Sequence, residues 1–297
     1  ALVKVKAVGI CGSELHAYAG VSKRRVPLVM GHKFAGEVAE VGEKVEGIQE
    51  GNRVVVDPII RCGTCDQCVS GRSNICKNMR LMGMHLPGGF SEYVAVPARN
   101  CVRLPGNVSL EEGTLVESLC VGIHAVGRTP VRLDDTVVVI GAGITGLMTM
   151  QVAKLAGTTK LIIIGGGRRE YRLELTKKLG ADIAINAKKE DPVKTIMKLT
   201  DMKGVDAVLE AVGIQTTVQQ AMRMVKKGGS VTVTGMLAPK MELEILDAVE
   251  EEKEIRGSYG YVPSDYKSAL DLIGAGRGLR KVHDNACFPI KRHRKRI

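Results

Sequence analysis

The sequence predicts an α/β protein with a β-rich first half and a doubly wound parallel sheet in its second half. In the first half, short apolar segments are divided by glycines and other turn residues, which is typical of an all-β region. In the second half, β-branched apolar segments alternate with helical ones, which favours a parallel sheet covered on both faces. A strand that runs straight into a glycine turn and an apolar helix begins this second half at Thr136.

The first half is expected to contain mainly strands. Strand patterns occupy residues 2–8, 34–41, 53–56 and 88–96. Between the first two, residues 9–16 form a predicted loop that carries a thiol, a hydroxyl, a carboxylate and an imidazole. A helical pattern appears at residues 110–114, and residues 117–125 are expected to begin a helix that links the two halves.

The second half is expected to alternate between strands and helices. Strands are predicted at residues 136–140, 160–164, 183–186, 205–212 and 230–234. Helices are predicted at residues 147–156, 169–179, 192–199 and 216–225. This alternation is the reason for expecting parallel strands joined by helical crossovers.

The turn after the first of these strands matches the dinucleotide fingerprint, with glycines at its first, third and sixth positions. Gly141 is expected to permit the tight turn, Gly143 to let the backbone approach a pyrophosphate, and Gly146 to let the helix pack closely on the strand. The helix start at Ile144 and Thr145 offers free N–H groups to phosphates. The alternative is a glycine-rich turn without a ligand.

Four of the eight cysteines lie within 15 residues, in the pattern CxxCxxCx7C. Thiolates at this spacing can close a tetrahedron around a structural zinc ion. An iron–sulfur cluster is the other metal that four cysteines would bind, and four unligated thiols are the remaining alternative. The predicted zinc ligands are Cys62, Cys65, Cys68 and Cys76.

The net charge of +11 comes mostly from residues 277–297, which hold eight Lys or Arg and one acid. A solvated tail is the favoured interpretation; nucleic acid is an unlikely partner because the chain has only nine aromatic residues for base stacking. No apolar run approaches the length of a membrane span, and nothing indicates secretion, so a cytoplasmic protein is expected. A missing N-terminal segment is expected, because the chain begins inside a predicted strand.

Several segments together resemble the zinc-containing medium-chain alcohol/polyol dehydrogenases, with the sorbitol and threonine dehydrogenases nearest in character. The matching segments are GICGSELHAYAG (9–20), GHKFAGEVAEVG (31–42), GNRVVV (51–56), CGTCDQCVSGRSNIC (62–76), GGFSEYVAV (88–96), ESLCVGIHAV (117–126), VVVIGAGITGL (137–147), LTKKLGAD (175–182) and GVDAVLEAVG (204–213).

This resemblance implies a GroES-like catalytic domain over residues 1–121, a Rossmann domain over residues 122–262, and a shortened return segment over residues 263–297. It also implies a reaction in the cleft between the domains on a small alcohol or polyol, and a homo-oligomer, dimeric or tetrameric, built through the edge of the Rossmann sheet.

The resemblance further implies a catalytic zinc ion that acts as a Lewis acid on the substrate hydroxyl. Cys11 and His32 correspond to two of its ligands. The third is Glu117 or Cys120; Glu117 is favoured because the surrounding segment is polyol-like, although such sites accept either a carboxylate or a thiolate.

Other residues of the same segments correspond to a proton path. Ser13 would relay the substrate proton and His16 would pass it towards solvent, while hydride moves to a nicotinamide. Two departures concern the metal. Glu14 replaces the Asp that orients the ligand histidine, and Lys33 replaces a Glu beside that histidine, so a positive charge comes close to the zinc position.

NADP is predicted over NAD as the coenzyme. An NAD site usually has an acidic residue about 20 residues beyond the glycines, where it binds the ribose. Here the strand ends in Gly165 and two further glycines, followed by Arg168 and Arg169, which suit a 2′-phosphate. The alternative is that both arginines begin a solvated helix.

The predicted function is hydride transfer between a secondary alcohol or polyol, or a threonine-like hydroxy compound, and NAD(P). The alternative is a zinc-stabilised nucleotide-binding protein whose catalysis is impaired by Lys33 and the shortened ends.

Overall fold

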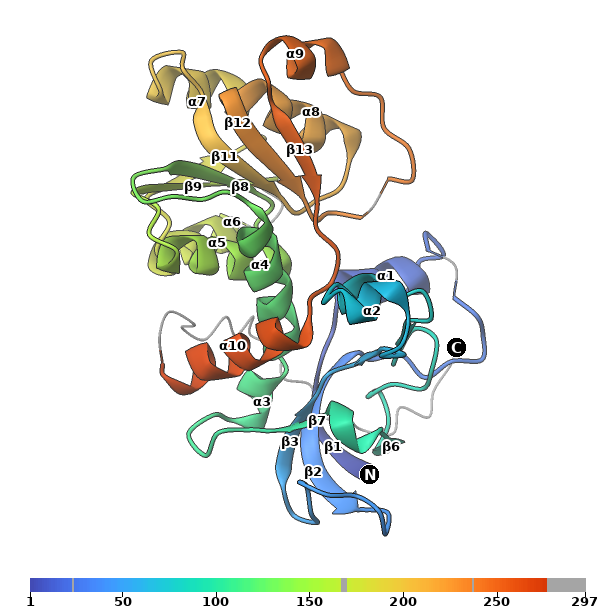
Figure 1. Cartoon of the computed structure of the whole chain (residues 1–297). Coiled ribbons are helices and arrows are strands. Elements are labelled where there is room, and N and C mark those ends of the chain that lie inside the picture. Colours follow the sequence, from blue (N-terminus) through green and yellow to red (C-terminus); the bar gives the residue numbers. More distant parts are fainter. Residues whose placement is uncertain (23, 167–169, 237, 277–297) are drawn as a thin grey trace.

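Figure 1 shows a computed structural model of the chain, which describes residues 1–22, 24–166, 170–236 and 238–276. The antiparallel sheet of the first half lies at the bottom of this view and the parallel sheet of the second half at the top, with two helices between them. The α/β fold predicted from the sequence is confirmed.

The first half contains a five-stranded sheet in the order β6-β1-β2-β3-β7. Its strands are β1 (Leu2–Gly9), β2 (Lys33–Glu40), β3 (Arg53–Val56), β6 (Tyr93–Ala95) and β7 (Cys101–Arg103). A second, two-stranded sheet pairs β4 (Ile59–Ile60) with β5 (Arg80–Leu81). Short helices connect them: α1 (Gly12–Tyr18), α2 (Asp66–Val69), η1 (Ser73–Ile75), η2 (Ala98–Asn100) and α3 (Leu110–Gly113). In β1, Val3 and Val5 are buried and Lys4 between them is exposed, as alternation in a strand requires.

The second half contains a six-stranded parallel sheet in the order β10-β9-β8-β11-β12-β13, which is the doubly wound order of dinucleotide-binding folds. Its strands are β8 (Thr136–Ile140), β9 (Lys160–Gly165), β10 (Ile183–Asn186), β11 (Val205–Glu210), β12 (Val225–Val233) and β13 (Glu254–Gly257). Its helices are α5 (Ile144–Leu155), α6 (Glu170–Lys178), α7 (Pro192–Leu199), α8 (Gln215–Met224) and α9 (Ile245–Glu250).

Two helices join the halves, α4 (Val116–Arg128) and α10 (Pro263–Gly274). One buried cluster extends across them and includes Ala35 of β2 and Val139 of β8, so the halves share apolar contacts. At Gly122, a Cβ atom would lie only 2.9 Å from the backbone nitrogen of Thr149, so α4 packs closely against α5. The predicted boundary at 121/122 falls inside α4 and that at 262/263 directly before α10; the division into domains stays a prediction.

Two local expectations are wrong. Residues 9–16 were expected to form a loop, but Gly12–Tyr18 form α1, because Glu14 accepts the N–H of Cys11 at 2.7 Å and caps the helix. Only Tyr93–Ala95 of the strand expected at 88–96 is extended. The preceding Gly88 and Gly89 instead turn tightly over Gly31, whose carbonyl oxygen would lie 2.3 Å from a Cβ at Gly88.

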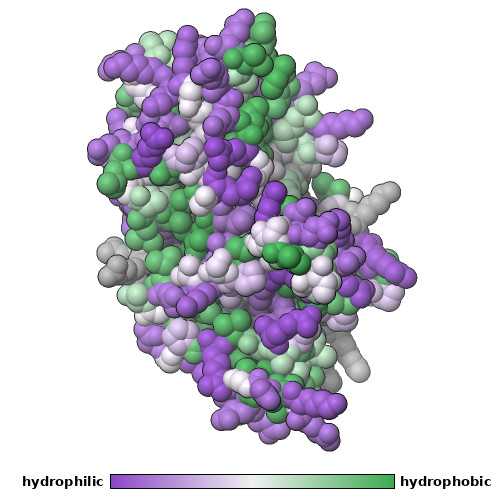
Figure 2. All heavy atoms as spheres, in the orientation of Figure 1, coloured by the Kyte–Doolittle hydropathy of each residue, from purple (hydrophilic) through white to green (hydrophobic). Residues whose placement is uncertain are grey.

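No helix in the described part of the chain is long and apolar enough to cross a membrane. Figure 2 shows hydrophilic residues over much of the face that it presents, with smaller groups of hydrophobic residues between them.

Candidate active site

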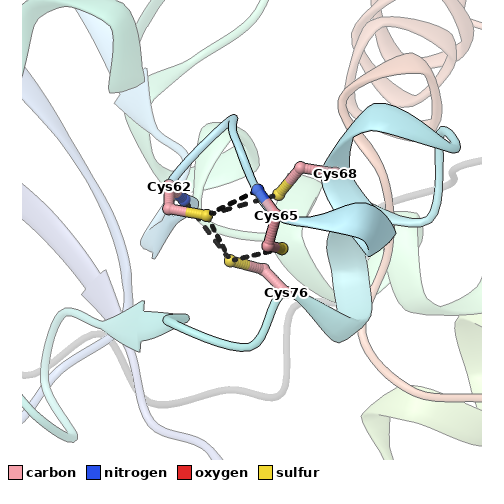
Figure 3. Close-up of side chains that lie close together, drawn as sticks. All are labelled: Cys62, Cys65, Cys68 and Cys76. Atoms are coloured by element: carbon pink, nitrogen blue, oxygen red, sulfur yellow. Dashed lines mark hydrogen bonds between the residues drawn. The ribbon is translucent and has the colours of Figure 1, made fainter.

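Four cysteine side chains meet in the lobe of residues 62–76 (Figure 3). Their sulfur atoms all lie within 4.8 Å of one another. The sulfur of Cys76 is 3.4 Å from that of Cys62 and 3.9 Å from that of Cys65, and the Cys62 and Cys68 sulfurs are 4.0 Å apart. Zinc–sulfur bonds of about 2.3 Å at tetrahedral angles place sulfurs about 3.8 Å apart. The lobe therefore fits a zinc ion.

Backbone N–H groups around this lobe favour the thiolate form that metals bind. Those of Thr64 and Cys65 lower the pKa of the Cys62 thiol to about 5. Those of Cys68 and Lys77 lower the pKa of Cys65. Burial and the neighbouring cysteines instead raise the pKa of Cys68 to about 12, so the thiolate form is favoured at Cys62 and Cys65 only.

A second group of polar side chains lies where α1 and β2 begin. Cys11 caps α1, and His32 directly precedes β2. The carboxylate of Glu14 joins them: it accepts the N–H groups of Cys11, Gly31 and His32 at 2.7, 3.0 and 3.1 Å, and lies 2.9 Å from Nδ1 of His32. Glu14 therefore orients His32, as the resemblance implied.

Charges perturb both candidate ligands in this group. Burial would raise the pKa of Cys11, but the interactions with His32 and Lys33 outweigh it and lower this pKa to about 6. Burial would lower the pKa of His32, but the interactions with Cys11 and Glu14 raise it to about 10. A thiolate and an imidazolium therefore face each other here.

Glu117, in the first turn of α4, belongs to the same group, whereas Cys120 does not. The Glu117 carboxylate lies 3.4 Å from the Nζ atom of Lys33. Cys120 is fully buried in the apolar cluster shared by the two halves, and this burial raises its pKa well above the ordinary value. The position of Glu117 supports it as the third residue of this centre.

Lys33 is the feature that a catalytic zinc ion would have to accommodate. Its ammonium group is buried, donates a 2.7 Å hydrogen bond to Ser118 Oγ, and interacts with both Cys11 and Glu117. A charge of +1 about 3.5 Å from a charge of +2 is repelled by roughly 9 kcal/mol at an effective dielectric constant of about 20. Among the described residues, only the four lobe cysteines bring three or more potential ligand atoms within 4.8 Å of one another. The centre at Cys11, as it stands, does not fit a zinc ion.

The two residues predicted for proton transfer lie on α1. The hydroxyl of Ser13 is buried and has no hydrogen-bond partner in the structure, which leaves it free to bind a substrate group. His16 lies three residues further along the helix, so both side chains lie on the same face.

The glycine turn connects β8 to α5 at the carboxyl end of the parallel sheet. Gly141 has a φ of 115°, which favours glycine. A Cβ at Gly146 would lie 1.7 Å from the carbonyl oxygen of Gly141, so no side chain fits there. No atom lies within 4 Å of the corresponding position at Gly143, and Ile144 and Thr145 begin α5 directly after it. The turn thus has open space above its backbone, where the helix N-terminus can bind a phosphate.

The end of β9 lies beside this turn, since a Cβ at Gly165 would be 3.2 Å from that of Ala142. The predicted phosphate ligands Arg168 and Arg169 lie outside the described residues.

Sequence analysis missed a carboxylate on the other side of the turn, Glu210. It is fully buried at the end of β11 and accepts the N–H groups of Val212 and Gly213 at 2.9 and 2.8 Å. It thereby fixes the loop that contacts Gly141, where a Cβ would lie 3.0 Å from Val212. The signal was an acidic residue directly after the apolar run Ala207–Leu209.

The fold and the site define a class: two-domain dehydrogenases with a cysteine-bound metal lobe. Residues 1–106 match the alcohol dehydrogenase GroES-like domain, and residues 145–275 match the zinc-binding dehydrogenase domain.

Individual proteins agree with this class. The sorbitol dehydrogenase of Bacillus subtilis is 33% identical over 93% of this chain and 79% of its own length. The L-threonine 3-dehydrogenase of Pyrococcus furiosus is 38% identical over 82% of this chain and 70% of its own length. The crystal structure of a zinc-binding dehydrogenase from Sinorhizobium meliloti bound to NADP superposes with a TM-score of 0.86, at 36% identity over 93% of this chain and 81% of that one. The chain belongs to the zinc-containing medium-chain alcohol and polyol dehydrogenase family.

Proposed function

We propose that this protein transfers a hydride between the carbinol carbon of a secondary alcohol or polyol, or of a threonine-like hydroxy compound, and a nicotinamide coenzyme. The observation that carries the proposal is the glycine turn Gly141–Gly146, with its open backbone at the carboxyl end of β8. The helix that follows it packs on α4, which carries Glu117. The named relatives act on a polyol and on threonine, and the comparisons give no support to the catalytically impaired alternative.

The residues around Cys11 would hold the reacting hydroxyl. As the Ser13 hydroxyl accepts the proton of the substrate hydroxyl, it would give its own proton to His16 on the same face of α1, and His16 would release a proton to solvent. Glu14 keeps the imidazole of His32 in place during this transfer. A bound coenzyme supplies the hydride acceptor. The predicted role of Cys11, His32 and Glu117 as catalytic zinc ligands stays a prediction, against which the position of Lys33 argues.

NADP is the coenzyme that we favour. The described end of β9 carries Gly165 and Gly166 where an NAD site would present a carboxylate. Arg168 and Arg169 follow in the sequence and would bind the 2′-phosphate. The S. meliloti structure holds NADP, but the preference proposed here rests on the residues of this chain.

The proposal also covers the metal content of the chain, its location in the cell and its assembly. The lobe of Cys62, Cys65, Cys68 and Cys76 would hold one structural zinc ion, supported by its sulfur geometry. A cytoplasmic location is favoured because four of the eight cysteines cluster in a metal-ligand pattern, which is more typical of a reducing compartment than a disulfide framework.

A homo-oligomer is supported by exposed apolar side chains near the open edge of the parallel sheet. Ile245, Leu246 and Val249 of α9 are each more than half exposed, and Ile255 lies on the edge strand β13. Covering such a patch with a second copy would remove it from water.

The test is coenzyme reduction by the full chain with alcohols, polyols and threonine, measured with both coenzymes. We expect turnover with at least one polyol or hydroxy acid and a kcat/KM that is higher with NADP than with NAD. Equal or better use of NAD would contradict the coenzyme proposal, and no reduction of either coenzyme by any substrate would contradict the function.

A further inference from the structure

The ammonium group of Lys33 is held beside one of the predicted metal ligands, and Lys33 directly follows another, His32, in the sequence. Its Nζ atom is 3.4 Å from Oε2 of Glu117 and 2.7 Å from Oγ of Ser118. Zinc binds carboxylate oxygen at about 2.1 Å and thiolate sulfur at about 2.3 Å. A zinc ion bound to Glu117 would therefore lie close to this ammonium group and be repelled by it.

The fold keeps Lys33 in this place. Lys33 is the first residue of β2, and its backbone pairs with Gly9 of β1, so the start of the side chain is fixed by the sheet. The side chain is 5% exposed, and a buried ammonium group requires polar partners. Ser118 and Glu117, neighbours at the start of α4, supply them.

Both carboxylates of the centre already have a cationic partner. Glu14 lies 2.9 Å from the His32 imidazole, and Glu117 lies 3.4 Å from the Lys33 ammonium group. The four lobe cysteines differ from this centre, because their sulfur atoms all lie within 4.8 Å of one another. The two groups of candidate ligands are therefore not equivalent as metal sites.

We propose that the ammonium group of Lys33 is the resident cation of the centre at Cys11, and that the chain binds a single zinc ion, in the four-cysteine lobe. The inference rests on the proposed position of the catalytic centre and specifies its cation.

The experiment is to count zinc atoms per chain by elemental analysis, after the full-length protein has been incubated with zinc and freed of unbound metal. We expect one zinc in the wild type. Lys33→Glu removes the ammonium group and adds a carboxylate beside His32, so its count should rise to two. Lys33→Arg is the matched control, because it keeps a cation and should stay at one. Two zinc atoms in the wild type, or one in both the wild type and Lys33→Glu, would overturn the proposal.

A second pair of variants tests the proposal even if Lys33→Glu fails to fold. Cys11→Ser should leave the zinc count of the wild type unchanged at one, whereas Cys65→Ser should lower it. A loss of zinc in Cys11→Ser would show that the centre holds the metal and would overturn the inference. The zinc count does not depend on turnover, so a failure of this inference can be told apart from a failure of the proposed hydride transfer, which is read from coenzyme reduction.

Discussion

The four-cysteine lobe and the centre at Cys11 are both rich in potential metal ligands, but they are stabilised differently. Of the lobe residues 62–76, only Asn74 and Cys76 are buried, and Val69 is 76% exposed. At the other centre, Glu14, His32 and Lys33 are buried, and each has a charged or hydrogen-bonded partner. The difference teaches that ligand types alone do not define a metal site. The lobe lacks an interior of its own, so the proposed zinc ion would hold it together, whereas both carboxylates of the centre already have cationic partners.

The largest expected effect is therefore the removal of a lobe cysteine. Cys65→Ser should abolish zinc binding and unfold the lobe, because a structural zinc site contributes on the order of 10 kcal/mol to the fold that it holds. Elemental analysis and thermal unfolding would measure both changes. Cys101→Ala is the matched control, because Cys101 is buried in the core of the antiparallel sheet, away from the lobe. This variant should bind as much zinc as the wild type. A Cys65→Ser protein with unchanged zinc content and Tm would show that the lobe does not depend on zinc. It would contradict the difference proposed between the lobe and the centre at Cys11.

A smaller effect is expected from Glu14→Gln, which tests whether charge pairs hold the second centre. The variant leaves the buried His32 without its anion, and a loss of about 3 kcal/mol in the free energy of unfolding is expected. The pKa of Glu14 is lowered from 4.5, chiefly by its interactions with His32, which outweigh burial. Its contribution is therefore fully present above about pH 4.5 and is lost as the pH falls through the lower pKa of the folded state.

Urea unfolding of the wild type and Glu14→Gln at about pH 7 and again near pH 3.5 would measure this dependence. The gap between the two proteins should narrow at the acidic value. A gap that is independent of pH would indicate that Glu14 acts through packing or shape instead of charge.

The smallest effect is expected from Cys120→Ala. Cys120 is fully buried among apolar side chains of α4, so losing its sulfur should cost about 1 kcal/mol and leave the zinc count unchanged. Denaturant unfolding and elemental analysis would test this. A lower zinc count in this variant would indicate that Cys120 is a zinc ligand. Both Glu117 and Cys120 would then again be candidates for the third ligand of the catalytic centre.

Features set by neighbouring residues could be predicted from the sequence. Strands 53–56, 136–140 and 183–186 and the helix 192–199 have the bounds that the structure gives them, because their hydrophobic patterns are strong and their ends are marked by turn residues or an Asp cap. The cysteine lobe and the glycine turn were found because each is a single short segment. In contrast, β13 and α9 were not predicted: β13 has the sequence EIRG, and α9 leaves its apolar residues exposed.

Contacts between distant residues could not be predicted. Lys33 was recognised as unusual, but its hydrogen bond joins it to Ser118, 85 residues away. That partner depends on how α4 packs over β2, which no local pattern encodes. Glu210 was missed for the same reason: its own hydrogen bonds are local, but the loop that it fixes contacts the distant Gly141 through Val212.

The contact of α4 with α5 at Gly122 sets the distance between the glycine turn and Glu117. Helix α5 begins at the glycine turn, and α4 carries Glu117, so the two helices together join the nucleotide side to the reacting side. At Gly122 the two helices are so close that a Cβ atom would not fit between them. A change of side-chain rotamer therefore cannot alter the distance between the helices there. The spacing between the glycine turn and Glu117 is thus set by contact between two backbones, and a side chain at position 122 would change it.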